Sequence, residues 1–99
     1  MSPTAETVRA ALAEVLDPEA EISIVDMGLV YDIAADGTGI RVRMTLTHPS
    51  CPAGDMLMSM VREALENIAG GCPVELDLTF DPPWTLDRIT PEGRRQLAF

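Results

Sequence analysis

The chain has 99 residues, of which 46% are apolar, and a formal net charge of −9 at pH 7. This length supports one hydrophobic core, so residues 1–99 are expected to form a single domain. All seven basic residues are arginine, against 16 acids, which disfavours a nucleic-acid-binding protein because such proteins need a basic patch. No apolar run approaches the roughly 20 residues that span a bilayer, and no signal-peptide pattern opens the chain. We therefore expect a cytoplasmic protein without a membrane segment.

The acidic residues are concentrated in the first third of the chain. Residues 1–39 carry eight acids and one arginine, whereas residues 40–74 carry three of each. Such an excess keeps a protein soluble, and it also attracts a partner with a basic surface. The sequence leaves both interpretations open.

The first segment predicts a helix that begins at Ser2-Pro3 and ends near Leu16. Proline is common at the first helical position, and Pro18 disfavours a helical conformation at Asp17. The apolar residues of this segment recur at helical spacing: Val8, Ala11, Leu12, Val15 and Leu16.

A turn and a short extended segment come next. Asp17-Pro18-Glu19 predicts the turn, and Ile22 and Ile24 are spaced to share one face of an extended segment. Gly28 is a candidate for a positive φ angle that ends this segment.

Two strands joined by a tight turn follow. Residues 29–34 are rich in side chains that favour strands, and residues 36–39 predict a hairpin turn rather than a phosphate loop, because a strand follows them. The second strand alternates strictly. Its core face carries Ile40, Val42, Met44 and Leu46, and its other face carries Arg41, Arg43, Thr45 and Thr47.

The next helix and strand complete the predicted sheet. The helix buries a stripe from Leu57 to Ile68 that includes Met60, leaves Met58 as an exposed contact, and ends at Gly70-Gly71. A third strand covers residues 74–80, and because strand–helix–strand units cross over right-handed, it should lie parallel to the second strand.

Pro82 and Pro83 should stop the sheet, since neither can donate to a strand ladder. Thr90-Pro91-Glu92 then predicts a short terminal helical tail over about 91–99, packed by Leu97 and Phe99. The fold class is therefore α+β: a two-layer sandwich with a small mixed β-sheet of about three main strands and helices mainly on one face.

Cys51 lies between the second strand and the second helix and is the strongest chemical signal in the chain. If Pro52 opens the helix, Cys51 lies at its N-cap, where the helix dipole lowers the pKa of a thiol. A thiolate attacks electrophiles and binds soft metals, although free cysteines are also common as small buried hydrophobes. His48, three residues earlier, is a possible second metal ligand or a solvated loop residue. Cys72 is expected to be structural, and the two cysteines and one histidine cannot complete a structural zinc site.

Four blocks in this order resemble one family: Asp17-Pro18-Glu19, residues 22–31, Met44-Thr45-Leu46-Thr47 with Cys51-Pro52, and Pro82-Pro83-Trp84-Thr85. The chain resembles the metal–sulfur cluster assembly family, also called domain of unknown function 59. That family includes SufT-type factors and one component of the phenylacetate-degradation oxygenase.

The resemblance implies a functional cysteine at Cys51. It implies supporting roles for Asp26 and Gly28 of the Asp-x-Gly-Leu segment, for Thr45 and Thr47, for Pro52 and for Trp84 of the Pro-Pro-Trp block. His48 departs from the family pattern, which has a small hydroxyl residue there, and Cys72 matches no family cysteine.

The implied function is an accessory factor of iron–sulfur cluster assembly, not an enzyme, that carries or hands over iron or a cluster. The cofactor would be an iron–sulfur cluster or iron, bound transiently. Because one cysteine cannot supply the usual four thiolates, the other ligands would come from a second copy, from another protein or from exogenous thiols. Its partners would be iron–sulfur assembly proteins, client apoproteins and, for a shared cluster, a second copy in a homodimer. The alternative is a metal-free interaction subunit of a multicomponent oxygenase of the phenylacetate-degradation type, or of a cluster-transfer complex.

Several supporting residues keep two interpretations. Asp26 could assist at a site or brace the turn before Gly28. Thr45 and Thr47 could bond a ligand or be ordinary strand residues. Trp84 is expected to be a packing anchor for the tail, with partner recognition as the other interpretation.

Overall fold

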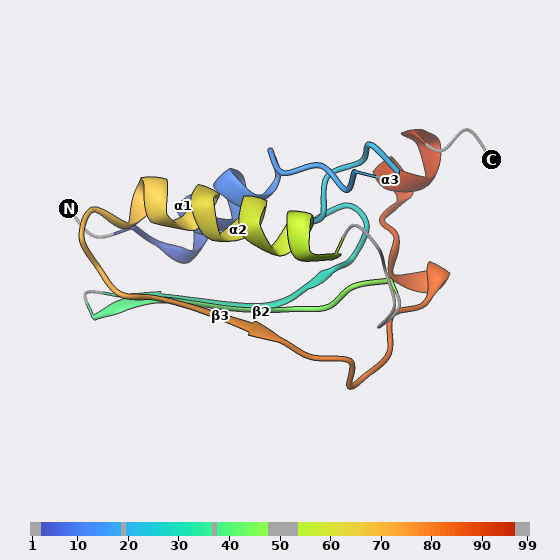
Figure 1. Cartoon of the computed structure of the whole chain (residues 1–99). Helices are drawn as coiled ribbons and strands as arrows, with labels where there is room; N and C mark the ends of the chain where they lie inside the picture. The colour runs from blue at the N-terminus through green and yellow to red at the C-terminus, as the bar shows by residue number, and fades with distance from the viewer. Residues whose placement is uncertain (1–2, 19, 37, 48–53, 97–99) are drawn as a thin grey trace.

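The computed structural model describes residues 3–18, 20–36, 38–47 and 54–96. Its sheet has the strand order β1-β2-β3, with β1 at Val30–Asp36, β2 at Gly39–Met44 and β3 at Val74–Leu78. Helices α1 (Ala5–Leu12) and α2 (Gly54–Ala69) cover the same face of this sheet (Figure 1). A 3-10 helix, η1 (Leu86–Arg88), and helix α3 (Pro91–Gln96) lie at one end of the molecule. The two-layer α+β fold is confirmed.

The pairing of the strands follows the prediction. β1 and β2 are antiparallel, with Asp36 opposite Gly39 at the hairpin turn, and β3 is parallel to β2. At the turn the Asp36 carboxylate accepts hydrogen bonds from the Thr38 hydroxyl and the Thr38 N–H, which hold the pKa of Asp36 below its usual range.

The core lies between the two helices and the sheet. The predicted core face of the second strand is confirmed, because Ile40, Val42, Met44 and Leu46 are all buried. The other fully buried apolar side chains come from α1, the segment before β1, and α2: Val8, Leu12, Ile22, Ile24, Leu29, Leu57, Val61 and Leu65. Apolar burial of this kind is the main stabilising term of a small domain.

Helix α1 (Ala5–Leu12) is shorter at both ends than the sequence predicts, since it begins after Thr4 rather than at Ser2-Pro3. Thr4 is the N-cap, since its Oγ1 accepts a hydrogen bond of 3.2 Å from the Thr7 N–H. The helix ends at Leu12, not near Leu16, because Val15 and Leu16 are extended and pair with residues 23–24. Leu16 is consequently 46% exposed and does not join the buried stripe.

The turn at Asp17 is confirmed by the Ala20 N–H, which donates to Asp17 Oδ1. Ile22 and Ile24 are both buried, but the extended segment expected there is wrong. Residues 24–28 form successive turns, and a single bridge at Ser23 is the only strand-like pairing of residues 20–28. Gly28 has φ +76°, so its predicted positive φ angle is confirmed.

Helix α2 buries Leu57, Val61, Leu65 and Ala69 and ends, as predicted, at two glycines with positive φ angles. Met60 was expected in the core and Met58 at the surface, and both expectations are wrong. Met58 packs against the core, whereas Met60 is 36% exposed. Each four-residue step along an α-helix rotates the side chain by about 40°, so the buried stripe drifts toward Met58 and away from Met60.

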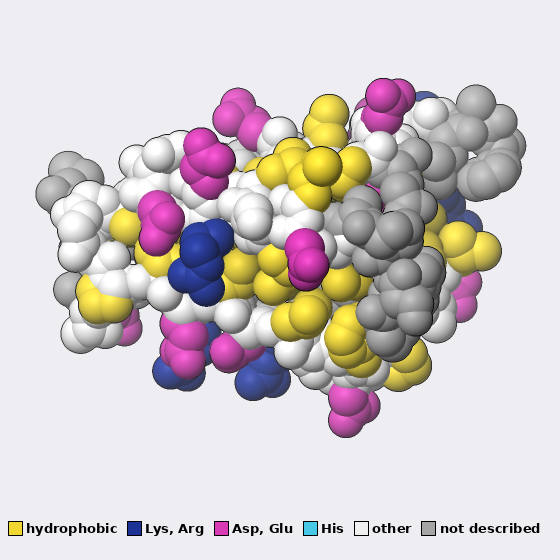
Figure 2. All heavy atoms as spheres, viewed as in Figure 1, with side chains coloured by type: hydrophobic (Ala, Val, Ile, Leu, Met, Phe, Trp, Pro, Cys, Tyr) yellow, Lys and Arg dark blue, Asp and Glu magenta, His cyan; other side chains and the backbone are white. Residues whose placement is uncertain are grey.

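The other face of the sheet has no helix over it among the described residues and carries charged side chains. Acidic and arginine side chains lie side by side along the lower margin of the molecule (Figure 2). The Arg41 Nε donates a hydrogen bond of 2.8 Å to the Glu75 carboxylate, which raises the pKa of Arg41, with a smaller contribution from the charge of Asp77. Within the described part of the chain, no helix is long and apolar enough to cross a membrane.

Candidate functional site

The predicted site centres on the segment between β2 and α2. Cys51, Pro52 and His48 lie outside the described residues, so their predicted roles stay predictions. Leu46, shortly before the segment, belongs to the core, and Gly54 is buried where α2 begins. The segment that contains Cys51 therefore leads directly into the N-terminal end of a 16-residue helix.

Thr45 is not an ordinary exposed strand residue, which was one of its two predicted interpretations. β2 ends at Met44, and the Thr45 side chain is completely buried. Its N–H donates to the Leu29 carbonyl, and its hydroxyl donates to the Leu46 carbonyl. The bond to Leu29 extends the antiparallel register of Val30 and Met44 by one residue. Thr47 is half-buried at the start of the cysteine segment.

Asp26 is bonded to the C-terminal part of the chain. Its Oδ1 accepts a hydrogen bond of 3.0 Å from the Thr90 hydroxyl, and its carbonyl accepts one of 2.8 Å from the Thr90 N–H. The Thr90 hydroxyl in turn accepts from the Gly93 N–H, which caps α3. Asp26 thus braces the tail against the turns before β1, and a part in ligand binding stays a prediction.

Gly28 and Trp84 take part in the same contact region. A Cβ at Gly28 would overlap the Arg88 carbonyl oxygen, so only glycine fits this close approach. The Trp84 Nε1–H donates to the Met27 carbonyl at 2.7 Å, and the indole packs against the core. The predicted packing role of Trp84 is confirmed. We call these contacts of residues 82–93 with residues 26–31 the C-terminal junction.

Three junction residues were not singled out by sequence reasoning. The Tyr31 hydroxyl donates to the Pro82 carbonyl at 2.7 Å, and the Arg88 guanidinium lies 4.6 Å from the centre of the Tyr31 ring. A Cβ at Gly93 would lie 2.9 Å from the Asp26 carbonyl oxygen. The available signal was the glycine inside a six-residue helix. Glycine destabilises a helix, so its presence there indicates that a neighbouring segment lies too close for a side chain.

Described residues offer no ready-made metal site, since no group of three or more His, Cys, Asp or Glu side chains is positioned to hold an ion there. Cys72 is a free, half-buried cysteine in the turn after α2, and its N–H donates to the Ala69 carbonyl. It therefore lies at the opposite end of α2 from Gly54, the end to which the cysteine segment leads.

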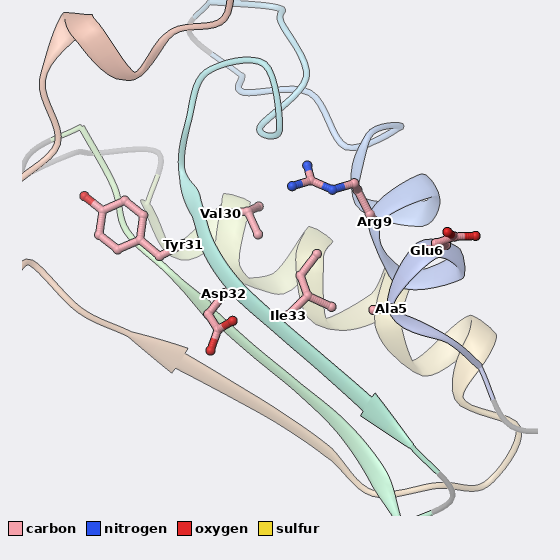
Figure 3. A pocket seen from close by; sticks show the side chains of 7 residues that line it. All are labelled: Ala5, Glu6, Arg9, Val30, Tyr31, Asp32 and Ile33. Carbon is pink, nitrogen blue, oxygen red and sulfur yellow. The ribbon is translucent and has the colours of Figure 1, made fainter.

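A shallow hollow of about 320 Å³ lies between α1 and the outer side of β1 (Figure 3). Arg9 extends from α1 toward the start of β1, and Glu6 points away from the strand (Figure 3). The hollow is open and carries one charge of each sign on the helix, so it lacks the enclosed, convergent polar groups of a ligand site.

Comparison with known proteins gives a consistent result. The family model described as "Iron-sulfur cluster assembly protein" matches residues 5–76, which include the cysteine segment and the helices on both sides of the β1–β2 hairpin. A protein of Porphyromonas gingivalis named "Fe-S protein maturation auxiliary factor" is 41% identical over 97% of this chain and 92% of its own length.

A crystal structure of a "Domain of Unknown Function DUF59" protein from Bacillus anthracis superposes with a TM-score of 0.87. It is 30% identical and covers 96% of this chain and 92% of its own. An Escherichia coli protein, named as a putative component of 1,2-phenylacetyl-CoA epoxidase, is 35% identical over 96% of this chain, which spans 58% of that relative.

Proposed function

Because this chain belongs to the iron–sulfur cluster assembly family, we propose that it is an accessory factor in the maturation of iron–sulfur proteins and not an enzyme. The observation that carries this proposal is the family match over residues 5–76, which spans Cys51 together with β2 and α2 on either side of it in the chain. A relative named as a maturation auxiliary factor aligns with nearly the whole chain and supports the same role.

The Cys51 thiolate is the proposed ligand for the cargo, either iron or a cluster. A cysteine just before a helix N-terminus has a lowered thiol pKa, and the thiolate is the form that binds soft metals. One thiolate leaves up to three positions of a cluster open, so the cargo is held between chains, in a homodimer or together with an assembly protein or a client apoprotein. The proposed compartment is the cytoplasm, because thiols stay reduced there.

The test is anaerobic reconstitution of the protein with iron and sulfide, alongside the variants Cys51→Ser and Cys72→Ser. We expect the parent and Cys72→Ser to retain iron and sulfide with a shift toward the mass of two chains, and Cys51→Ser to retain neither. Cys72→Ser is the matched control because it removes the other thiol, at the far end of α2. Equal iron in all three proteins contradicts the role of Cys51, and iron in none of them contradicts the carrier function.

A second function is a metal-free interaction subunit, which the similarity to the epoxidase component favours. In that case Cys51→Ser leaves client maturation unchanged, whereas substitutions on the binding surface abolish it. Measuring client activity with both kinds of variant separates the two functions.

A further inference from the structure

The two edge strands of the sheet, β1 and β3, differ in how far they are protected from pairing with a further strand. Among the described residues, β3 pairs with β2 alone. The Thr79 N–H and the Pro73 carbonyl both bond to β2, so odd-numbered residues of this segment turn their backbone groups toward β2. Backbone groups alternate in direction along a strand, and Leu76 and Leu78 therefore turn their N–H and C=O groups outward.

The other edge, at β1, is irregular and partly covered. The register shifts between Val30 and Asp32, which is a β-bulge, and the intervening Tyr31 is held by Pro82. Helix α1 packs along β1 (Figure 3). Bulges and neighbouring helices are among the features that prevent a further strand from pairing with a sheet edge. β3 has no bulge in its register with β2.

The helix-side face of β3 and the residues just beyond it offer an exposed apolar strip. Leu76 is half-buried, Leu78 is 43% exposed and Phe80 is 37% exposed. Figure 2 shows hydrophobic side chains gathered between α2 and the lower margin of the molecule on the side where β3 lies. An added strand would cover this strip with its own apolar residues.

On the open face of the sheet, the charges of neighbouring side chains alternate in sign from one strand to the next. In register, Asp32 of β1 lies opposite Arg43 of β2, and Arg43 lies opposite Asp77 of β3; Arg41 likewise lies opposite Glu75. The charged residues of the outermost strand, β3, are both acidic: Glu75 and Asp77. Opposite charges on neighbouring strands are stabilising and like charges are destabilising, so basic residues on an added strand would continue the pattern.

We propose that the outer edge of β3 binds an extended segment of a partner protein in which apolar and basic residues alternate. The outward backbone groups of Leu76 and Leu78 bond the partner strand, Glu75 and Asp77 select its basic side chains, and the apolar strip covers the others. A second copy of this chain does not fit, because antiparallel pairing of β3 with itself places acids opposite acids. This surface does not involve Cys51, so the proposal can be tested independently of the carrier function.

The test uses the metal-free protein and two synthetic peptides of about seven residues, the length of a typical strand. One peptide alternates Arg with Val, and the other alternates Glu with Val. In an amide chemical-shift titration, the Arg–Val peptide is expected to bind with saturation in the millimolar range or below and to shift Leu76 and Leu78 most. The Glu–Val peptide is expected not to bind.

Matched variants locate the contact. Leu78→Pro removes an outward N–H without removing a bond to β2 and should abolish binding, whereas Leu78→Val keeps the N–H and should retain it. Asp77→Asn should weaken binding about threefold, the weight of one cross-strand charge pair, and Asp32→Asn on β1 should leave it unchanged.

Four results overturn the proposal: no binding of the Arg–Val peptide, equal binding of both peptides, shifts centred on β1, or equal binding by Leu78→Pro and Leu78→Val. Iron retention in the reconstitution experiment is unaffected by any of them, so a failure here is distinguishable from a failure of the carrier function.

Discussion

The C-terminal junction and the free edge of β3 lie in the same small domain but are built differently. At the junction, Asp26 and Trp84 bond the tail to the turns before β1, and glycine at position 28 permits a close approach of backbones. At the β3 edge, backbone groups and apolar side chains face outward without such contacts among the described residues. Several residues implied by family resemblance therefore hold the fold together, while the surface suited to a partner strand lies elsewhere.

Gly28 is the junction position at which substitution should cost most. Gly28→Ala should lower the free energy of unfolding by about 3 kcal/mol, because a Cβ would strain the positive φ angle and overlap the Arg88 carbonyl. Gly70→Ala is the matched control: φ is +61° there, but no atom lies within 4 Å of the added Cβ, so a loss of about 1 kcal/mol is expected. Urea unfolding measures both, and equal losses would show that the junction is not tightly packed.

Trp84→Phe should lower the free energy of unfolding by about 1.5 kcal/mol. The ring remains, but the Met27 carbonyl loses the hydrogen bond that the indole N–H donates. Thermal unfolding followed by circular dichroism measures this loss. An unchanged melting temperature would mean that the indole N–H contributes nothing to holding the tail.

Thr90→Val should cost about 1 kcal/mol, since the hydroxyl both caps α3 and donates to Asp26. Thr90→Ser keeps the hydroxyl and should cost less than about 0.5 kcal/mol. Hydrogen exchange of the Gly93 amide should accelerate in Thr90→Val alone. If both variants exchange alike, the Thr90 hydroxyl does not cap α3.

Substitutions at the β3 edge should change stability least. Arg41 and Glu75 are both more than half exposed, so Glu75→Gln should change the free energy of unfolding by no more than about 0.5 kcal/mol. Raising the salt concentration should have a similarly small effect on the parent. A loss as large as that of Thr90→Val would mean that this edge contributes to the stability of the fold, not only to binding.

The sequence was sufficient for the features that depend on local periodicity. Strict alternation placed Ile40, Val42 and Met44 in the core, and the glycine pair after α2 marked its end. The errors arose where tertiary contacts decide. Thr45 continues the alternating pattern on the face of Arg41 and Arg43, yet its side chain is completely buried, which alternation alone does not predict. Met60 fits a helical stripe, but the buried stripe drifts toward Met58.

The junction could be predicted only in part. Resemblance singled out Asp26, Gly28 and Trp84, but pairing them with Thr90, Arg88 and Met27 requires contacts about 60 residues apart in the chain. Periodicity carries no information about such contacts. Cys51, Pro52 and His48 lie outside the described residues, so experiments must test their predicted roles.

Cluster transfer to an acceptor protein is the decisive experiment for the carrier function. The reconstituted protein is mixed anaerobically with an apo-ferredoxin in the presence of an iron chelator, and the visible spectrum of the acceptor is followed. We expect the parent to fill the acceptor despite the chelator, whereas a mixture made with Cys51→Ser should not. Filling by free iron and sulfide at the same rate, or filling by Cys51→Ser equal to that of the parent, would contradict a carrier role for Cys51.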